Sequence, residues 1–177
     1  NEGIPANPYL FFSENLKAQI YLKQNKIDSA FANAKSAFYG LPKNALHAST
    51  FAQTLAVKKD VIETKKAFEV ISEKSGTVIW KNFLIVLSQI VQSGDKDLVK
   101  YAIQAAKFFP DDKEIFSLKK LAVIGEANIN RSNLISKEGL DFFNRGLYTE
   151  AAIKFENAAS IDSLEYAHFE NAASAYF

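Results

Sequence analysis

The sequence predicts an all-α fold of stacked, antiparallel helix pairs. Small residues recur on one predicted helix face, and Pro or Gly follows the predicted helix ends. The same features return after 34 residues, the distance from Ala18 to Ala52, Pro42 to Gly76, Gly76 to Pro110 and Gly139 to Ala173. One helix pair cannot bury its apolar face alone, so we expect the pairs to stack into one solenoid over residues 1–177.

The first unit is predicted over residues 8–44. Asn7 is suited to cap the free backbone N–H groups of a helix that runs to about Lys23. A second helix covers about residues 28–39 and carries alanines on one face, where small side chains allow close helix contact. Gly40 is expected to end it, because glycine tolerates the left-handed backbone of a helix terminus.

Two further units are predicted over residues 45–76 and 77–110. Asp60 and Glu63 have the spacing of a capping box, which predicts the start of a helix between them. Residues 83–91, taken alone, also fit a buried strand, but the flanking helical pairs favour a helix.

The repeat pattern weakens after Pro110. Residues 111–131 are too few for a complete unit, which indicates either a lost helix or residues missing from the sequence. We expect a loop, or such a gap, at residues 125–130. A further unit over 132–165 and a partial unit over 166–177 follow, with capping-box spacing again from Asp162.

Composition excludes several classes of function. The 177 residues include 21 Lys and Arg against 20 Asp and Glu, and this net charge of +1 does not favour nucleic acid or an anionic membrane as partner. No apolar run is long enough to cross a bilayer, so we expect no membrane contact by this segment. The chain begins with Asn1 rather than Met and stops inside a predicted helix, so we expect a part of a larger protein.

The sequence offers no catalytic pattern. It has no Cys, and its two histidines, His47 and His168, lie far apart without metal-ligand companions. We therefore expect a non-enzymatic segment with no metal and no cofactor, in which both histidines are structural or lie at the surface. The aromatic residues expected in the core are Phe68, Phe83, Phe142, Phe155 and Tyr176.

Two residue strings resemble the tetratricopeptide repeat (TPR) family. The C-terminal string is Gly139, Phe142, Gly146, Tyr148, Ala151, Phe155 and Ala158, and the N-terminal one is Ala18, Tyr21, Ala30, Ala34, Ala37 and Pro42. The resemblance implies a right-handed superhelix that acts as a scaffold, with the first helix of each pair lining a concave groove for a protein or peptide partner. Carried over by repeat position, it implies these groove residues: Phe12, Asn15, Gln19, Lys23, Ser49, Gln53, Lys81, Ile85, Ser88, Gln89, Ser136, Leu140, Phe143 and Asn144.

A narrower resemblance covers about a quarter of the chain. Ile27–Ala30, Ala34–Pro42 and Leu46–His47 are similar to repeats appended to bacterial O-antigen ligase or polymerase-like membrane proteins. This resemblance implies an alternative function, a soluble accessory domain of an envelope glycan ligase or polymerase. It would place the segment in the periplasm or cell envelope, and without this resemblance we expect a cytoplasmic segment.

Self-association is a third expectation. The last predicted helix carries Phe169 and Tyr176, and no following helix of this sequence covers them. A second copy is one way to cover that face.

Overall fold

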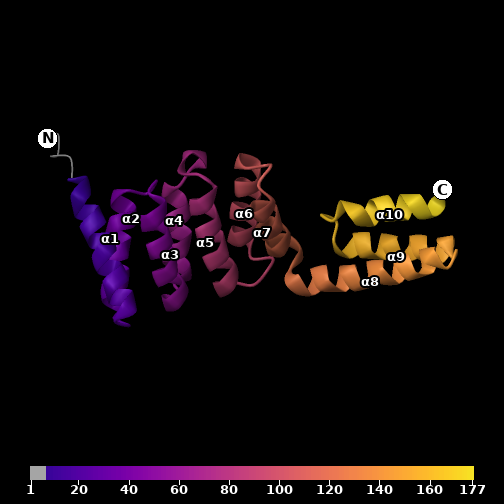
Figure 1. Ribbon diagram of the computed structural model, residues 1–177, viewed down its shortest axis with the longest axis horizontal. Helices are drawn as coiled ribbons and strands as arrows, with labels where there is room; N and C mark the ends of the chain where they lie inside the picture. Colours follow the sequence, from indigo (N-terminus) through magenta and orange to yellow (C-terminus); the bar gives the residue numbers. More distant parts are fainter. Residues whose placement is uncertain (1–6) are drawn as a thin grey trace. The chain divides into compact units, whose positions relative to one another are not determined.

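The computed structural model describes residues 7–177, which form ten α-helices and one short 3₁₀-helix (Figure 1). No β-strand occurs in these residues, so the all-α prediction is confirmed. The elements are α1 Pro8–Lys23, α2 Ile27–Gly40, α3 Ala45–Lys58, α4 Val61–Val70, η1 Glu73–Ser75, α5 Thr77–Ile90, α6 Lys96–Phe108, α7 Lys113–Ile124, α8 Glu126–Asn144, α9 Tyr148–Ile161 and α10 Tyr166–Tyr176.

The chain divides into two compact units. The first extends to Lys119 and the second runs from Lys120 to Phe177. In the first unit, consecutive helices from α1 through α6 pack against one another, and α3 also contacts α1 and α5 (Figure 1). In the second unit, α9 packs against both α8 and α10. The single solenoid over residues 1–177 stays a prediction, and its residues 1–6 lie outside the described residues.

Short polar side chains fix the beginnings of several helices. Asn7, Asn44 and Asp95 precede α1, α3 and α6, and the side-chain oxygen of each accepts backbone N–H bonds of 3.0–3.1 Å from the first turn. These bonds satisfy donors that have no partner within the helix. Residues 83–91 also fitted a buried strand. They are helical up to Ile90, the last residue of α5, so the helical prediction is confirmed there.

The capping box predicted at α4 is only half formed. Asp60 accepts a 2.9 Å bond from the backbone N–H of Glu63, as expected. The Glu63 side chain does not return this bond, because α2 brings two other partners to it. Its carboxylate accepts a 2.8 Å bond from the Tyr39 hydroxyl and pairs with Lys35 at 2.9 Å. The Glu63 residue is only 6% exposed, and its carboxylate needs such partners because burying an unpaired charge is costly.

Small residues and aromatic rings form the core of the first unit. Its fully buried alanines include Ala18, Ala30, Ala34, Ala37 and Ala48. Beside them, fully buried Phe38, Phe51 and Phe83 come from α2, α3 and α5. The ring centroid of Phe38 lies 5.2 Å from that of Phe51 and 5.0 Å from that of Phe83. These distances are typical of favourable aromatic pairs. Consecutive helix pairs therefore share one core.

Gly40 has a role that differs from the prediction. It is the last residue of α2, and its backbone does not adopt the left-handed conformation that was expected. A Cβ atom at this position would instead collide with the ring of Phe11 in α1. Glycine is required here because the Phe11 ring rests directly on the backbone of α2.

The loop or gap predicted at residues 125–130 is wrong. Only Gly125 separates α7 from α8, and α8 begins at Glu126 and extends for 19 residues. Gly125 makes this turn with a φ of 82°, a conformation that glycine adopts at no steric cost. The amide of Asn128 then donates a 3.0 Å bond to the carbonyl of Ile124 at the end of α7. The described residues contain no separate second helix between α7 and α8.

The core of the second unit is also built from small residues around a ring. Its members are Ala151, Ala152, Phe155, Ala172 and Ala175, with Phe142 and Phe143 packed against them. Among the predicted core aromatics, Phe68, Phe83 and Phe155 are buried and Phe142 is partly buried. The prediction is wrong for Tyr176, which is 61% exposed and donates a 2.9 Å bond to Glu156. The buried face of α10 consists of His168, Ala172 and Ala175 instead.

A cluster of ionised side chains joins the end of α7 to the turn before α10. The Lys120 amine pairs with Asp162 at 2.9 Å and with Glu165 at 2.6 Å, and the Asp162 side chain is fully buried. The hydrogen bond from Lys120 lowers the pKa of Glu165. Because Glu165 is engaged with Lys120, the second predicted capping box does not form, and α10 begins without a side-chain cap.

Both histidines are buried, which agrees with a structural role. His47 is fully buried and its Nδ1 lies 3.1 Å from the carbonyl oxygen of Ala37, while Nε2 has no partner. His168 is 3% exposed and neither ring nitrogen has a partner. Burial lowers the pKa of both rings, although the Ala37 carbonyl and the carboxylates near His168 act in the opposite direction.

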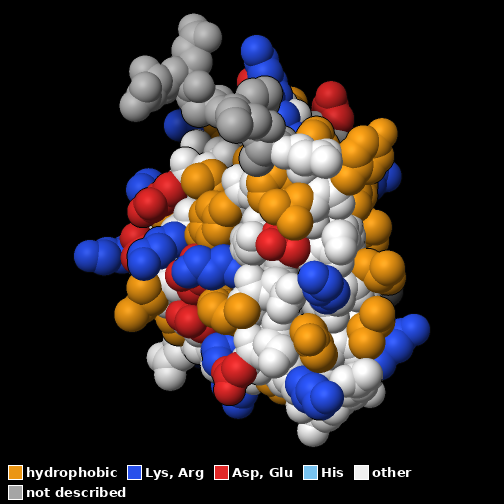
Figure 2. Space-filling view, turned by 90° about the vertical axis from the view of Figure 1, so that its left-hand side faces the viewer, with side chains coloured by type: hydrophobic (Ala, Val, Ile, Leu, Met, Phe, Trp, Pro, Cys, Tyr) orange, Lys and Arg blue, Asp and Glu red, His pale blue; other side chains and the backbone are white. Residues whose placement is uncertain are grey.

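Some large apolar side chains remain at the surface. Figure 2 looks at the side of the molecule on which α1 lies in Figure 1, and hydrophobic side chains appear there between charged ones. On α1, Tyr9, Leu16 and Ile20 are 80%, 58% and 45% exposed. Scattered apolar residues are ordinary at protein surfaces, but a stripe along one helix is not.

Overpacking at Ala30 should destabilise the first unit. Ala30→Phe adds a ring to a fully buried helix contact and should cost about 1–3 kcal/mol or more. The matched control is Ala32→Phe, because Ala32 lies on the exposed face of the same helix. Thermal unfolding followed by circular dichroism gives the comparison. Equal destabilisation by the two substitutions would contradict the assigned packing of α2.

A methyl group at Gly139 should be destabilising, although Gly→Ala in a helix ordinarily stabilises by about 1 kcal/mol. A Cβ atom there would lie 2.8 Å from a ring carbon of Phe155, so Gly139→Ala should cost about 1–3 kcal/mol. A double-mutant cycle with Phe155→Leu tests the contact. The cost of Gly139→Ala should fall when the ring is absent, and an unchanged cost would show that the ring is not the cause.

Acidification below about pH 6.5 should weaken the fold. Unfolded histidines take up protons near pH 6.5. The folded rings stay neutral to lower pH because their pKa is lowered. The unfolded state then binds more protons, so the free energy of unfolding falls as the pH falls. Urea unfolding at several pH values measures this effect. In the His168→Leu variant, only the pH dependence due to His47 should remain. A free energy of unfolding that does not change with pH over this range would refute the prediction.

Candidate ligand-binding groove

Two adjoining hollows lie on the exposed side of α3, α5 and α7. The first has a volume of about 230 Å³ and is lined by Ser49, Ala52, Gln53, Ala56, Asn82, Ile85, Val86 and Gln89. Four of these residues are ones that the repeat resemblance selected. Ser49 and Gln53 come from α3, whereas Ile85 and Gln89 come from α5. The packing of α3 against α5 brings the two pairs together.

The second hollow continues the first towards α7. Its volume is about 520 Å³, and it is lined by Val78, Lys81, Asn82, Ile85, Glu114, Ser117 and Leu118. Asn82 and Ile85 line both hollows, so the two form one continuous surface. We call the lining residues of both hollows the central groove.

Uncharged polar and small apolar groups dominate the first hollow. Gln53 and Gln89 are exposed and carry amides that can both donate and accept hydrogen bonds. The Nδ2 atom of Asn82 is buried and has no hydrogen-bond partner. A buried donor without a partner costs free energy, and a carbonyl group of a ligand could relieve that cost. Ile85, 41% exposed, supplies an apolar contact beside these amides.

The lysine of the central groove is already neutralised. The amine of Lys81 forms ion pairs with Glu114 and, at 3.4 Å, with Asp112. The hydrogen bond to Glu114 raises the pKa of Lys81, although burial acts against it. Two backbone N–H groups, from Ile115 and Glu114, and the Lys81 amine lower the pKa of Asp112. An anionic ligand would therefore have to compete with two carboxylates for this cation.

The predicted residues of α1 lie in different surroundings. Gln19 donates a 3.3 Å bond to the hydroxyl of Thr50 in α3, and Asn15 is only 3% exposed with its Oδ1 atom unpaired. Lys23 is exposed in the last turn of α1. None of the three lines the central groove.

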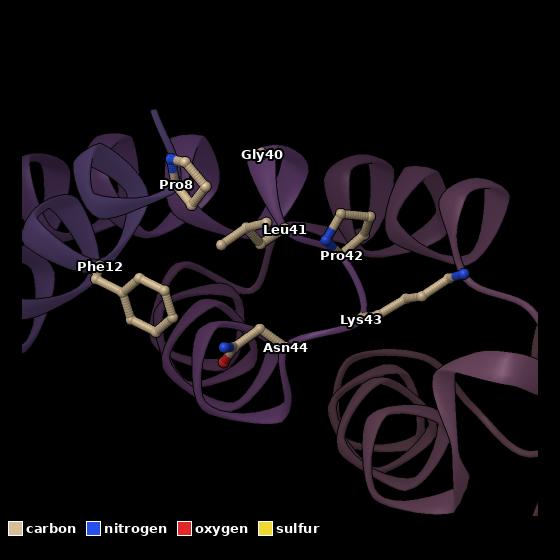
Figure 3. Close-up of a pocket in the computed structure, with 7 residues that line it drawn as sticks. All are labelled: Pro8, Phe12, Gly40, Leu41, Pro42, Lys43 and Asn44. Atoms are coloured by element: carbon tan, nitrogen blue, oxygen red, sulfur yellow. The ribbon is translucent and has the colours of Figure 1, made fainter. Parts of the chain in front are cut away.

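Phe12 lines a separate hollow of about 490 Å³ (Figure 3). Its ring centroid lies 4.9 Å from that of His47, in an edge-on arrangement. In Figure 3, Phe12 and Leu41 face the hollow, while the side chain of Lys43 extends away from it. The remaining lining residues are Pro8, Gly40, Pro42 and Asn44.

The predicted residues of α8 belong to the second unit. Ser136 is buried, and Phe143 packs against the core of this unit, with its ring centroid 5.1 Å from that of Tyr148. Leu140 is 44% exposed and Asn144 is also exposed. In the first unit, Ser88 donates its hydroxyl to the carbonyl of Ile85 at 2.8 Å and does not line either hollow.

The repeat positions did not select Asn82, which lines both hollows of the central groove. Asn82 precedes Ile85 by three residues and Gln89 by seven, so helical spacing alone places the three on one face of α5. No comparable sequence pattern indicated that Glu114, Ser117 and Leu118 line the central groove, because the repeat pattern weakens after Pro110.

Other kinds of site are not seen among residues 7–177. No group of three or more His, Asp or Glu side chains in this range is placed to hold a metal ion. No helix there combines the length and apolar character needed to span a bilayer. A scan against protein-family models found no match, and a search of curated proteins found none either.

Proposed function

We propose that this chain is a repeat module of the tetratricopeptide type, built as a right-handed superhelix, that binds an extended segment of a protein partner without catalysis. The partner segment would lie along the central groove, across the exposed faces of α3, α5 and α7. The module then works by holding another molecule, and its own residues carry out no reaction.

The order of helix contacts supports the repeat assignment. Besides packing with its neighbours in sequence, α3 contacts α1 and α5, so the first helices of successive pairs touch one another. This is the arrangement that aligns first helices along one surface in a stack of helix pairs. The 34-residue spacing of equivalent small and turn residues points in the same direction.

One observation carries the binding proposal: Asn82 lines both hollows, and its Nδ2 donor is buried without a hydrogen-bond partner. Every residue of an extended peptide offers a backbone carbonyl, and Nδ2 of Asn82 can donate to one of them. Gln53 and Gln89 flank this position and can bond neighbouring backbone groups. Ile85 and Ala52 can contact an apolar side chain, and the first hollow has room for a small one at about 230 Å³.

Charge narrows the choice of partner segment. Lys81 is the one cationic residue that lines the central groove, and it is paired with Asp112 and Glu114. Strong binding of a carboxylate requires charge-assisted bonds that this paired lysine does not readily supply. We therefore expect an uncharged segment rather than an acidic one.

Selection from a library of random peptides displayed on phage tests this function. The wild-type chain should enrich peptides that are uncharged across the residues bound, because the groove offers amides and apolar contacts. The variant Gln53→Ala with Ile85→Ser should weaken binding of a selected peptide by at least about tenfold, as expected for central contact residues.

The matched control is Gln92→Ala with Ile103→Ser. Both residues are exposed and lie outside the central groove, so peptide affinity should not change. Circular dichroism establishes that both variants are folded. Failure to enrich any peptide, or equal affinity in the groove variant and the control, would refute the proposed function.

A further inference from the structure

Helix α1 presents an apolar stripe that the other helices of the first unit leave exposed. Tyr9, Leu16 and Ile20 are separated by seven and four residues, so they lie on one face of the helix, and all three are exposed. Lys17 and Lys23 are exposed on the same side of α1. Figure 2 shows this side of the first unit, on which hydrophobic side chains lie among basic and acidic ones. We call Tyr9, Leu16, Ile20 and these two lysines the α1 face.

Helix α10 presents a second stripe, in the other unit. Tyr166, Phe169 and Tyr176 are 70%, 49% and 61% exposed and are separated by three and seven residues. Glu170 is exposed between them, and α10 contains no Lys or Arg. We call these three aromatic residues and Glu170 the α10 face.

The α10 face is also hollowed. A depression of about 440 Å³ lies between α9 and α10 and is lined by Glu156, Ala159, Ser160, Phe169 and Ala172. An apolar side chain that projects from a partner helix would fit there, as ridges fit grooves in helix packing. The lining adds a second acidic group, Glu156, which is exposed.

The two faces carry opposite charges. A contact between two α1 faces would bring lysines together, and a contact between two α10 faces would bring carboxylates together. An α1 face against an α10 face instead opposes Lys17 and Lys23 to Glu170. Complementary charges of this kind select one pairing and disfavour the like-charged ones.

We propose that the α1 face of one copy of this chain docks on the α10 face of a second copy. Each copy then uses a different surface from its partner, which makes the interface heterologous. Such an interface leaves one free α1 face and one free α10 face at the ends of the assembly, so copies add head to tail into open chains unless a ring closes. This assembly does not involve the central groove and stands apart from the proposed function.

Two single variants and their mixture test the polarity of the contact. Leu16→Glu blocks the α1 face and Phe169→Glu blocks the α10 face, and both positions are exposed, so the fold should persist. In sedimentation velocity over a wide concentration range, the wild-type chain should form species larger than a dimer. Each variant alone should be monomeric. The mixture should form a one-to-one dimer, because each variant retains the face that the other lacks.

Each alternative gives a different pattern. Assembly of Leu16→Glu alone would show pairing of two α10 faces, and assembly of Phe169→Glu alone would show pairing of two α1 faces. A wild-type chain that is monomeric at every concentration would show that something other than a second copy covers these faces. Any of these three results overturns the proposal.

Charge exchange provides an independent check. Glu170→Lys should raise the dissociation constant of the assembly at least about tenfold, as expected for a residue at the centre of an interface. Adding Lys17→Glu and Lys23→Glu in the same chain restores opposite signs and should restore assembly. Added salt should weaken wild-type assembly, because exposed charges are screened. Assembly that is indifferent to all of these changes would overturn the role given to charge.

Discussion

Close contact between helices at residues with little or no side chain is the constraint on which the structure depends. Alanines with no exposed surface lie between the helices of the first unit, and alanines surround Phe155 in the second. At Gly40 and Gly139 the approach is closer still, since an aromatic ring of a neighbouring helix rests on the backbone itself. Such contacts fix the distance between helices, and each large ring fills the space that small residues leave.

The candidate groove follows from this packing. Because α3 contacts both α1 and α5, residues on the outer faces of these helices become neighbours although they are far apart in sequence. Ser49 and Gln53 thus come to share a hollow with Ile85 and Gln89. The same arrangement buries the donor of Asn82 without a partner, and a ligand carbonyl could supply one. The candidate groove and the core packing are in this sense two consequences of one helix arrangement.

The groove and the two outer faces differ in chemistry, which favours separate roles for them. The groove offers amides and a lysine already paired with two carboxylates, a combination suited to an uncharged backbone. The outer face of α1 is apolar and basic, and that of α10 is aromatic and acidic. A protein with both kinds of surface could hold a partner segment while it assembles with its own copies, since neither activity covers the residues that the other needs.

The sequence by itself determined most of the helices, the caps at Asn7 and Asp60 and the small-residue contacts, because these depend on local spacing and local hydrogen bonds. It also selected four residues that share the first hollow. Only the tertiary structure decided which partner each polar side chain finds. Glu63 and Glu165 turn from their expected caps to Tyr39, Lys35 and Lys120, and Asn15 and Ser136 are buried. Likewise, Tyr176 is exposed and α8 starts directly after Gly125. The start of α8 follows from the local turn at Gly125, whereas the other outcomes depend on groups distant in the chain, which spacing within one helix does not encode.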